Sequence, residues 1–446
     1  MTIPSTYKVA KLSDYVYYQE GPGIRNYQNT TEGIKFLNIR CFVNGRLDTA
    51  SMKKVAESEA LGKYRHFLLD VGDYVVSSSG TLGRIAEVYP EDLPVMLNTS
   101  TIRFRPIDNL LLDRLYLRYF LESEVFQQQV KSLATGSVQL NYGPSHLAFV
   151  EMPLPPIEIQ KAIGKVLDSI TRKIELNSQA SKTLEDIAQA VFKSWFIDFD
   201  PVKAKMARER PVGMDAATAS LFPSSMEDSE LGLVPKGWQV GSLFDFGLEI
   251  ESGSRPKGGV KGISSGVPSI GAESINGLGV FDFSKTKFVP RDFYEKMNKG
   301  KPRDFDVLLY KDGGKPGEFK PRVGMYGLGF PFNEFAVNEH VFVLRAMDLG
   351  NPYLYFWIRL ERTLDILRSR GIKAAIPGIN QQDVGTIPAL KPPQEILKAF
   401  NELVFPSISK ILTLATESLM LTTLRDTLMP RLISGELQIP EEMLAS

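Results

Sequence analysis

The longest regular pattern of apolar positions in the chain lies between Pro155 and Asp198. No proline occurs between Pro156 and Pro201, and Gly164 is the only glycine in that interval. On an alternating step of four and three residues from 159 to 198, eight of twelve positions are apolar. This pattern predicts a long helix of roughly 60 Å with a packing seam. The apolar positions include Ile159, Ile163, Val166, Ile170, Ala180, Leu184, Ile187 and Val191.

The opening of this helix occurs a second time in the chain. The stretch from Pro392 to Phe400 matches the one from Pro155 to Ile163 at six of nine positions. We therefore expect a second long helix that pairs with the first. Pro406 lies within it and is expected to kink or interrupt it. The helical spacing resumes at Ile408, Leu412, Ala415 and Leu419.

Each long helix follows a segment of mixed strand and helix pattern. Residues 67–76 predict a turn into a buried strand, residues 98–105 alternate like a strand, and residues 110–133 have a helical pattern. Residues 236–388 repeat this order at nearly constant offsets. Among the matches, Tyr353–Phe356 correspond to Leu115–Arg118.

These patterns predict an α/β (α+β) chain with a pseudo-twofold internal repeat, in which a globular domain and a long helix each occur twice. We expect a first globular domain at 1–153, a central helix at 154–200, a connector at 201–235, a second globular domain at 236–388 and a C-terminal helix at 389–446. The connector region contains Pro211, Gly213 and Pro223 and is expected to be loop-like.

Composition narrows the class of protein. The 446 residues contain 52 Lys plus Arg and 52 Asp plus Glu, so that any basic surface must be local. Cys41 is the only cysteine, which fits a reducing compartment. No apolar run approaches the roughly 18 residues of a membrane span, and no signal pattern opens the chain. These features predict a soluble, cytoplasmic protein without membrane contact.

Several groups of residues have the chemistry of nucleic-acid contacts. Residues 77–84 form a loop of small hydroxyl residues and glycine that ends in an arginine, and such loops let backbone amides approach phosphates. Residues 253–322 hold 14 Lys/Arg against 8 Asp/Glu, which suits phosphate neutralisation or a solvated basic face. Arginine, asparagine and glutamine are usual readers of guanine and adenine edges. The candidate DNA contacts are Arg25, Tyr27, Asn38, Arg40, Arg46, Ser77, Ser78, Ser79, Thr81, Arg84, Gln139, Asn141, Arg255, Lys257, Lys261, Lys311, Lys315, Lys320, Arg322 and Gln381.

Two polar residues, Lys173 and Asn177, interrupt the apolar seam of the first long helix. A polar residue at a seam position can fix the register of two helices. The alternative is that the seam faces a partner or solvent there.

The patterns of catalytic sites are weak in this chain. Asp306 with Glu318 and Lys320 imitates the acidic pattern of a nuclease, but the first globular segment has no equivalent. The sequence has neither a phosphate-binding G-x-x-x-x-G-K-[ST] loop nor the Asn-Pro-Pro-aromatic run of an amino-methyltransferase, and its three histidines show no metal-ligand spacing. We therefore expect no catalytic, cofactor-binding or metal site in this chain.

As a set, four motifs resemble the DNA-specificity subunit of type I restriction-modification enzymes. They are residues 154–160 (LPPIEIQ), 192–202 (FKSWFIDFDPV), 232–238 (GLVPKGW) and 430–437 (PRLISGEL). Pro406 and the absence of a leucine before Pro392 depart from the family pattern. The resemblance implies two target-recognition domains that are separated by the two long helices, which form an antiparallel pair. Each domain would read half of a split site in double-stranded DNA.

The resemblance also implies the partners. The helices would set the spacing between the half-sites and dock two modification subunits, which carry methyltransferase chemistry with S-adenosylmethionine. Restriction subunits would add ATP- and Mg²⁺-dependent translocation and cleavage. The partner-binding candidates on the first helix are Ile159, Ile163, Ile170, Leu184, Phe192, Trp195 and Phe196.

Two other classes of function remain as alternatives. One is a single-chain nuclease or methyltransferase with its own recognition domains. The other is a scaffold that spaces protein partners and does not contact DNA.

Overall fold

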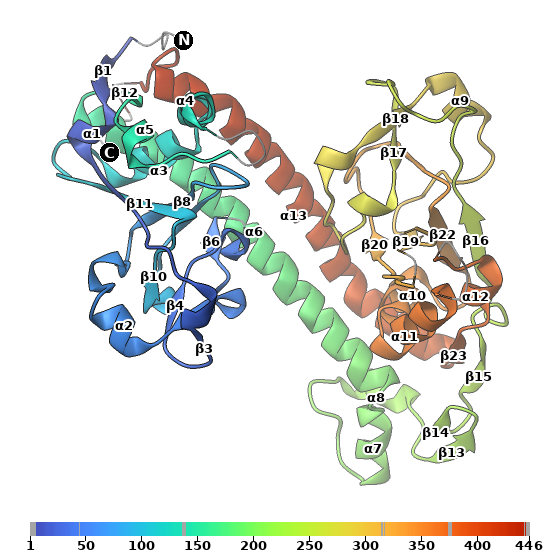
Figure 1. Cartoon of the computed structure of the whole chain (residues 1–446). Helices are drawn as coiled ribbons and strands as arrows, with labels where there is room; N and C mark the ends of the chain where they lie inside the picture. The colour runs from blue at the N-terminus through green and yellow to red at the C-terminus, as the bar shows by residue number, and fades with distance from the viewer. Residues whose placement is uncertain are drawn as a thin grey trace. The chain divides into compact units, whose positions relative to one another are not determined.

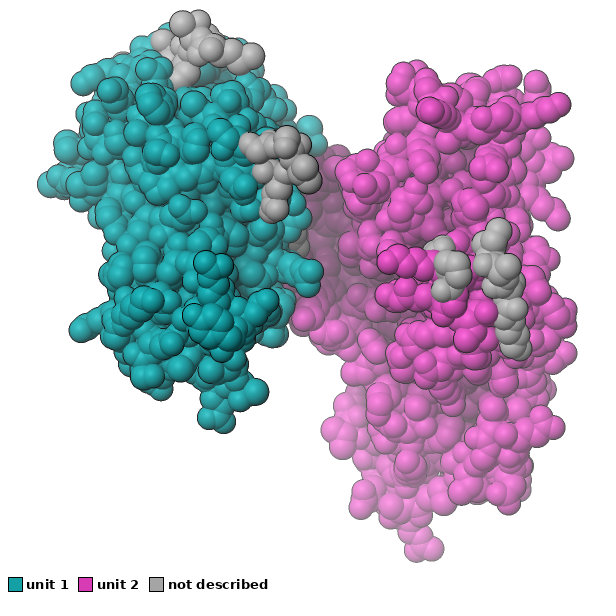
Figure 2. Space-filling model, in the orientation of Figure 1, with its two compact units in different colours: residues 1–173, 421–446 teal, residues 174–420 magenta. Residues whose placement is uncertain are grey.

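The computed structural model describes residues 6–43, 45–135, 140–313, 315, 317–372, 377–440 and 442. The chain forms two compact units (Figures 1 and 2). Unit 1 comprises residues 1–173 and 421–446, and unit 2 comprises residues 174–420.

Two long helices dominate the secondary structure (Figure 1). Helix α6 spans Ile157–Phe196 and begins directly after the Pro155-Pro156 pair. Helix α13 spans Gln394–Ser434 and follows Pro392-Pro393 in the same way. The predicted helix between Pro155 and Asp198 is therefore confirmed. Because the boundary between the units falls inside both helices, each helix contributes one end to each unit.

Pro406 was expected to kink or interrupt the second helix, and an interruption does not occur, because α13 is continuous through Pro406. Proline removes one backbone donor, and its ring crowds the carbonyl four residues earlier, which here belongs to Glu402. Both Pro406 and Glu402 are exposed. Water can therefore satisfy the carbonyl that loses its partner, and the helix continues.

Unit 1 is built on two four-stranded sheets with the orders β2-β11-β8-β9 and β10-β4-β7-β3. A two-stranded sheet, β1-β12, joins the start of the chain to the strand that leads into α6. The elements are β1 (Lys8–Lys11), α1 (Leu12–Tyr15), β2 (Val16–Glu20), β3 (Asn29–Thr30), β4 (Ile34–Phe36), η2 (Ile39–Cys41), β5 (Phe42–Val43), β6 (Arg46–Leu47), β7 (Lys53–Val55), α2 (Glu57–Leu61), β8 (Tyr74–Ser77), β9 (Ile85–Glu87), β10 (Val95–Met96), β11 (Thr101–Pro106), α3 (Arg114–Glu122), α4 (Glu124–Leu133), α5 (Pro144–Leu147) and β12 (Glu151–Leu154).

Unit 2 has the same plan. Its sheets have the orders β16-β22-β19-β20, β18-β17-β21 and β15-β23. The elements are β15 (Gln239–Ser242), β16 (Leu248–Ser252), β17 (Val267–Ile270), η6 (Ala272–Ser274), η7 (Phe283–Lys285), β18 (Lys287–Val289), α9 (Arg291–Lys296), β19 (Val307–Tyr310), β20 (Val323–Met325), β21 (Ala336–Val337), β22 (Val341–Ala346), α10 (Asn351–Ile358), α11 (Glu361–Gly371), α12 (Gln381–Gly385) and β23 (Pro388–Lys391).

Matching contacts fix the register of the repeat. The Tyr116 hydroxyl donates to the Pro153 carbonyl at 2.7 Å, and the Tyr353 hydroxyl donates to the Leu390 carbonyl at 2.6 Å. The shift along the sequence that carries Pro153 onto Leu390 also carries Tyr116 onto Tyr353, and it relates the two helix openings as well. Tyr353 therefore corresponds to Tyr116, and the predicted match of Tyr353 to Leu115 is corrected by one position.

A second matched contact lies in the main sheets. Asp73 precedes β8 and is bound by Arg105 of β11, while Asp306 precedes β19 and is bound by Arg345 of β22. Both aspartates are 2% exposed. The buried ion pair is therefore part of the shared frame of the two copies.

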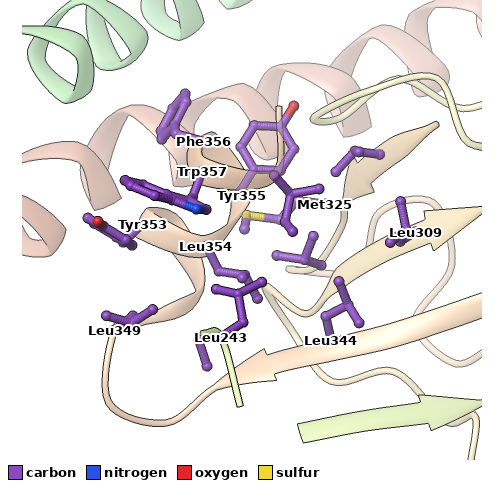
Figure 3. Close-up of a cluster of buried hydrophobic side chains, with 14 of the residues drawn as sticks. Leu243, Leu309, Met325, Leu344, Leu349, Tyr353, Leu354, Tyr355, Phe356 and Trp357 are labelled. Atoms are coloured by element: carbon purple, nitrogen blue, oxygen red, sulfur yellow. The ribbon is translucent and has the colours of Figure 1, made fainter. Parts of the chain in front are cut away.

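The hydrophobic cores show how the helix ends are used. In unit 2, Phe192, Trp195 and Phe196 of α6 pack with α10 and α13 in one large core, and the ring centroids of Phe196 and Tyr353 lie 4.9 Å apart. Figure 3 shows the α10 side of this core around Tyr353 and Trp357. In unit 1, Ile163 and Leu167 of α6 join Leu432 and Ile433 of α13 in the corresponding core.

The connector is structured, contrary to the expectation of a loop. It contains α7 (Asp200–Met206), α8 (Ala216–Leu221) and a hairpin of β13 (Met226–Ser229) with β14 (Gly232–Pro235). Phe222 is 1% exposed and contacts the Trp195 ring at a centroid distance of 5.2 Å. The connector thus contains short elements despite its proline and glycine residues, and aromatic packing against α6 holds them within unit 2.

The end of α13 returns to the start of the chain inside unit 1. The Thr6 amide donates to the Ser434 carbonyl at 3.3 Å, and the Thr6 hydroxyl donates to the Gly435 carbonyl at 3.0 Å. Gly435 has φ +79°, and an added Cβ would lie 2.4 Å from Thr6 Oγ1. This junction requires glycine both for its backbone conformation and for the close approach.

Candidate nucleic-acid interface

Corresponding loops lead into β9 of unit 1 and β20 of unit 2. In unit 1 the Ser77 amide donates to the Arg84 carbonyl at 2.9 Å. In unit 2 the Tyr310 amide donates to the Arg322 carbonyl, also at 2.9 Å. Arg84 and Arg322 each directly precede the receiving strand, and neither is buried. The repeat therefore presents one arginine at the same place in both copies.

The serines of the unit 1 loop hold the loop together. The Ser77 hydroxyl donates to the Thr81 carbonyl at 2.6 Å and accepts from the Arg84 amide at 2.9 Å. Ser77 and Ser78 are 0% and 1% exposed. Because both side chains are buried, the predicted DNA contacts of the two hydroxyls are corrected. The Ser77 hydroxyl bonds within the loop, whereas Ser78 Oγ has no hydrogen-bond partner among the described residues. Thr81 and Arg84 are exposed, and Ser79 is half-buried beside Asn141 through a β-bridge.

A surface pocket of about 440 Å³ lies beside Arg84 in unit 1. Its other lining residues are Phe42, Val43, Gly45 and Ile85. They come from the β5–β6 hairpin, which follows η2, and from the start of β9. This pocket therefore has one cationic side chain and otherwise apolar or backbone walls.

A pocket of unit 2 that is lined by the equivalent arginine, Arg322, measures about 280 Å³ and is more highly charged. It lies between η6 and the loop before β20. Its lining includes Glu273, Tyr310, Lys315, Glu318, Lys320 and Arg322.

Two hydrogen bonds hold the Arg322 guanidinium over η6. Its Nη1 donates to the carbonyls of Ala272 and Glu273, each at 3.4 Å. The Glu273 carboxylate accepts from Lys287 Nζ at 2.8 Å. Burial raises the pKa of Glu273, but the bond from Lys287 and the neighbouring charges lower it more, so that the net pKa lies below its usual range. A fixed carboxylate and a fixed guanidinium thus share one pocket.

The side chain of Lys311, a candidate DNA contact, is partly enclosed by other side chains. Its Nζ lies 2.8 Å from the Asp312 carboxylate and 5.5 Å from the centroid of the Phe342 ring. Asp312 also contacts the His340 ring. Burial raises the pKa of Asp312, but the bonds from Lys311 and His340 give a net lowering. Lys315, Lys320 and Arg322 are the more exposed cations of this loop.

The remaining candidates of unit 1 fall into two groups. Arg25, Tyr27 and Arg40 are exposed, Tyr27 at 87%. The Asn38 side chain accepts from the Arg40 amide at 2.8 Å and caps η2, while the Arg46 guanidinium lies 3.6 Å from the centre of the Tyr89 ring. Asn38 and Arg46 thus have structural contacts of their own. Gln139 lies outside the described residues.

The remaining candidates of unit 2 are on its surface. Arg255, Lys257, Lys261 and Gln381 are exposed. Arg255 pairs with Glu339 at 2.9 Å, and Gln381 Nε2 donates to the Ile250 carbonyl at 3.4 Å. Their exposure is compatible with contacts to either bases or phosphates.

The nuclease-like acidic pattern does not form a site. Asp306 is engaged by Arg345 in the main sheet, while Glu318 pairs with Lys320 at the surface. Among the described residues, no group of three His, Cys, Asp or Glu side chains is arranged to hold a metal ion.

The partner-binding prediction for α6 requires correction. Ile163, Phe192, Trp195 and Phe196 are at most 6% exposed and fill the cores of their own units. Ile159 and Leu184 pack against these cores as well. Ile170 is half-buried. The seam is apolar as predicted, but most of its side chains pack in the cores of this chain and are not available to a partner.

Other apolar side chains of the two long helices remain exposed. They are Leu176, Ile187, Leu403, Phe405, Met420 and Leu424, with exposures of 43% to 66%. Within the described residues, α13 alone is long and apolar enough to cross a membrane by length and composition, and 28% of its most apolar window is buried. One face of α13 is buried in the core of unit 2, and another apolar face of the same helix is exposed.

Asn177 settles one open alternative about the seam. It is 2% exposed, and its Nδ2 donates to Glu417 Oε2 at 3.0 Å and to Ser418 Oγ at 3.3 Å. Both acceptors lie on α13. Within unit 2 the polar seam residue therefore fixes the register of α6 against α13.

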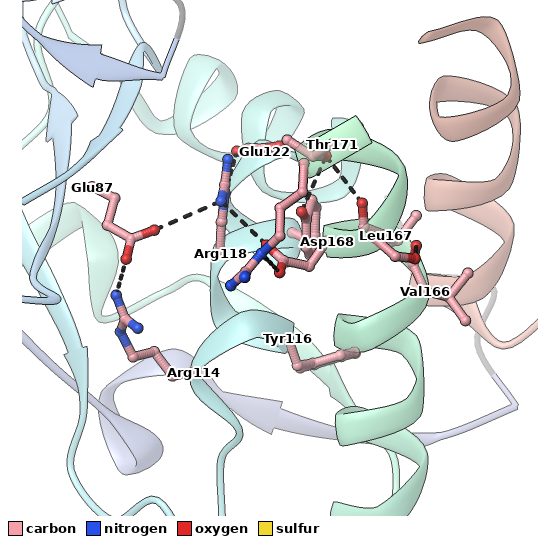
Figure 4. Close-up of polar contacts among 12 residues, drawn as sticks. Glu87, Arg114, Tyr116, Arg118, Glu122, Val166, Leu167, Asp168 and Thr171 are labelled. Carbon is pink, nitrogen blue, oxygen red and sulfur yellow. Dashed lines mark hydrogen bonds and ion pairs between the residues drawn. The ribbon is translucent and has the colours of Figure 1, made fainter. Parts of the chain in front are cut away.

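Arginines join each globular part to α6. In unit 1, Arg118 of α3 is 8% exposed and lies 3.6 Å from both Glu87 of β9 and Asp168 of α6 (Figure 4). Arg114 also contacts Glu87, and Arg172 contacts Asp168 at 2.5 Å. In unit 2, Arg359 and Tyr355 both contact Glu185 of α6. In unit 1 these contacts join β9, α3 and α6. In unit 2 they join α6 to Tyr355 of α10 and to Arg359, which directly follows α10.

Glu273 was missed as a site residue. The signal was present in the repeat, because Gly33 and Gly266 both have positive φ directly before β4 and β17. That alignment places Glu273 of η6 at the position of Arg40 of η2. A search for basic residues identifies Arg40 but not Glu273, the acidic residue at the equivalent position.

Comparisons with known proteins agree with this architecture. Residues 4–186 match the family model of the type I restriction modification DNA specificity domain. The chain is 27% identical over 377 residues to the type I restriction enzyme MjaIX specificity subunit of Methanocaldococcus jannaschii, covering 83% of this chain and 78% of the relative. It is 24% identical to the HindI specificity subunit of Haemophilus influenzae, covering 96% and 100%. A crystal structure of the type I system S subunit of M. genitalium shares the fold, with a TM-score of 0.56 at 15% identity over 97% of this chain and 99% of that one.

Proposed function

We propose that this chain, a member of the type I restriction-modification specificity subunits, reads a bipartite site in double-stranded DNA and performs no catalysis itself. Each globular part reads one half of the site. The two long helices space the half-sites and dock the catalytic partners.

The observation that carries this proposal is the internal repeat. The main sheets of the two copies have the same strand order, and the Tyr116–Pro153 and Tyr353–Leu390 bonds coincide under one shift along the sequence. The loops at the pockets differ in sequence and charge. A shared frame with divergent loops is the arrangement expected of two readers with different half-sites.

We assign the recognition domains to residues 1–153 and 236–388. Residues 154–200 and 389–446 provide the helical segments, and residues 201–235 are a structured connector. DNA contacts are assigned to those members of the candidate set whose side chains are accessible: Arg25, Tyr27, Arg40, Thr81, Arg84, Asn141, Arg255, Lys257, Lys261, Lys315, Lys320, Arg322 and Gln381. The lysines would neutralise phosphates and displace counterions, and the arginines would contact phosphates or guanine edges.

The catalytic functions are assigned to other chains. Two modification subunits would bind S-adenosylmethionine and transfer its methyl group, and restriction subunits would use ATP and Mg²⁺. We assign modification-subunit docking to the exposed apolar side chains of α6 and α13, of which Leu176, Ile187 and Met420 are at least 53% exposed. The assembled complex would be cytoplasmic, where its DNA substrate lies.

Methylation mapping tests this proposal directly. The chain is co-expressed with its modification subunits in a host without other methyltransferases, and methylated positions are mapped across the genome. The expected result is one motif of two defined halves with an undefined gap, absent when this chain is omitted. Exchange of residues 1–153 for the first domain of another member should change one half only. A motif without two halves, or a change in both halves, would contradict the proposal.

The spacing function has its own test. Insertion of four residues after Ser178, which is exposed on α6, lengthens a helix by roughly 6 Å, close to two base pairs. The half-site bases should stay unchanged while the gap grows by about one to three base pairs. An active insertion variant with the original gap would show that α6 does not set the spacing.

A further inference from the structure

The charged pocket of unit 2 has the chemistry to read a particular base pair. Its two fixed groups are the Glu273 carboxylate, which accepts hydrogen bonds only, and the Arg322 guanidinium, which donates only. Both line the same pocket, and Arg322 Nη1 bonds to the backbone carbonyl of Glu273 at 3.4 Å. A ligand that bridges them must present a donor and an acceptor side by side.

A C·G base pair presents this combination in the major groove. The cytosine N4 amino group is a donor, while guanine O6 and N7 are acceptors. Arginine binds O6 and N7 in a bidentate manner, and glutamate accepts from N4. An A·T pair has no pair of acceptors that matches a guanidinium fork in this way.

The repeat supplies a second observation, because the equivalent arginine also lines a pocket in unit 1. Unit 1 has its own pocket at the corresponding loop, and Arg84 lines it at the position equivalent to Arg322. The residue equivalent to Glu273 is Arg40, which has the opposite charge. Arg40 does not line the unit 1 pocket, so the arginine recurs at the pockets of both copies, whereas the acidic lining residue Glu273 belongs to the second copy.

We propose that Glu273 and Arg322 determine specificity for one C·G base pair in the half-site read by the second domain, with Arg322 on guanine and Glu273 on cytosine. This rests on the proposed DNA-reading function. It names the base pair that this pocket selects and assigns Glu273, an acidic residue, to a surface that otherwise binds DNA through cations.

Lys287 holds the reading carboxylate in place. Its Nζ bonds to one carboxylate oxygen of Glu273 at 2.8 Å, and the backbone amide of Glu273 also bonds to the carboxylate. Because each carboxylate oxygen can accept more than one hydrogen bond, the group keeps the capacity to accept from cytosine. Glu273 is 38% exposed, so that the carboxylate is both restrained and reachable. The ion pair also offsets the repulsion between Glu273 and the phosphates of DNA.

The test compares Glu273→Gln and Arg322→Ala in the complex with modification subunits. The readouts are the genome-wide methylation motif and competition binding with duplexes altered at single base pairs. Each variant should lose discrimination at the same single position of one half-site, by roughly 5- to 150-fold. The other half-site should be unchanged. Glu273→Gln should also admit A·T at that position, because glutamine pairs with adenine N6 and N7.

Glu334→Gln is the matched control. Glu334 is 41% exposed and pairs with Arg291 at 2.6 Å, as Glu273 pairs with Lys287, but it does not line the pocket. Its motif should equal that of the unaltered chain. Glu273→Asp keeps the charge and should retain the preference for C·G with weaker discrimination, which separates loss of reading from loss of folding.

Several outcomes would overturn the inference. An unchanged motif in both pocket variants, a uniform loss of affinity for all duplexes, or a changed position that is not C·G would each do so. In all three cases a bipartite motif would still stand, and the proposed function with it. Absence of a bipartite motif from the unaltered complex would instead reject the proposed function.

Discussion

The two proposed recognition domains share one frame but differ in their distribution of charge. Residues 1–153 contain 16 Lys/Arg and 16 Asp/Glu, whereas residues 236–388 contain 21 and 17. In the first domain, Arg103, Arg105 and Arg118 are engaged with carboxylates or carbonyls of the frame. In the second, Lys315 and Arg322 line the pocket at the surface. Equal folds therefore do not imply equal contributions to DNA affinity.

The joints to the helices differ as well. Arg118 is almost fully buried among three carboxylates, whereas the Arg359 side chain is 35% exposed beside Glu185. At a second contact with the long helices, the glycine lies on the helix in the first copy and on the globular part in the second. Gly164 of α6 allows the approach of Asp113, whereas at the corresponding place in the second copy Asn401 of α13 lies against Gly350. The frame is preserved through contacts of equal size and not through equal residues.

The largest effect is expected from the aromatic end of α6. Phe196→Ala should destabilise unit 2 by about 3–5 kcal/mol, because a fully buried ring leaves a cavity. Ile433→Ala, the equivalent change in α13, should cost about 2–5 kcal/mol in unit 1. Hydrogen-exchange mass spectrometry locates each loss. Ile187→Ala, at an exposed position of α6, is the control. Faster exchange in both units after either change would show that a helix end does not stabilise only the unit whose core it joins.

The second largest difference between the two domains is expected at the arginines that contact α6. Arg118→Met leaves Glu87, Glu122 and Asp168 without their common partner and should cost about 3 kcal/mol, because buried carboxylates lose compensation. Arg359→Met should cost only about 1 kcal/mol, because solvent screens that site. Thermal unfolding of both variants measures the difference. Equal losses would show that burial does not distinguish the two joints.

The glycine contacts allow a test by compensation. Gly164→Ala should cost about 1–3 kcal/mol, because its Cβ would lie 2.7 Å from Leu115 Cβ. Gly350→Ala should be destabilising both through its φ of +83° and through a contact of 2.5 Å with Asn401. Denaturant unfolding of Gly350→Ala should improve when Asn401→Ala is added. Without that improvement, the amide would not be the source of the clash, and backbone strain alone would explain the loss.

The smallest effect concerns phosphate contacts. The double change Lys315→Ala and Lys320→Ala should lower the log–log salt slope of DNA binding by about two, or one for each lost phosphate contact. Stability should change little, since both side chains are exposed. Lys296→Ala is the control, because Lys296 is exposed on α9 and does not line the pocket. Equal slopes for the pocket and control variants would show that the pocket cations do not bind phosphate.

Periodicity and repetition were sufficient to predict the architecture. The spacing of apolar residues identified α6, and the repeated Pro-Pro opening identified α13 and the paired globular parts. The errors arose where tertiary contacts overrode a local rule. Pro406 is tolerated because its surroundings are solvated, and the connector is ordered by the burial of Phe222 against Trp195.

The site could be predicted only in part. Arg84 and Arg322 were identified as candidate arginines, and the structure places them at corresponding loops. Residue type could not show that Ser77 is buried, or that Phe192 fills the chain's own core and leaves Leu176 and Met420 on the surface. Burial depends on which segments meet in space, and the sequence pattern gives only the periodicity of each segment.

The junction between Thr6 and Gly435 imposes an order on biosynthesis. The core of unit 1 includes Leu432 and Ile433, yet these side chains leave the ribosome only after all of unit 2 has been made. At roughly 5–20 residues per second, translation from the end of the first segment of unit 1 to Leu432 takes about 10–50 s. During that interval the N-terminal domain waits without the α13 side chains that complete its core. The first domain to be translated is therefore the last to be finished, and a nonsense mutation near the 3′ end of the reading frame would be felt in the half of the protein that was translated first.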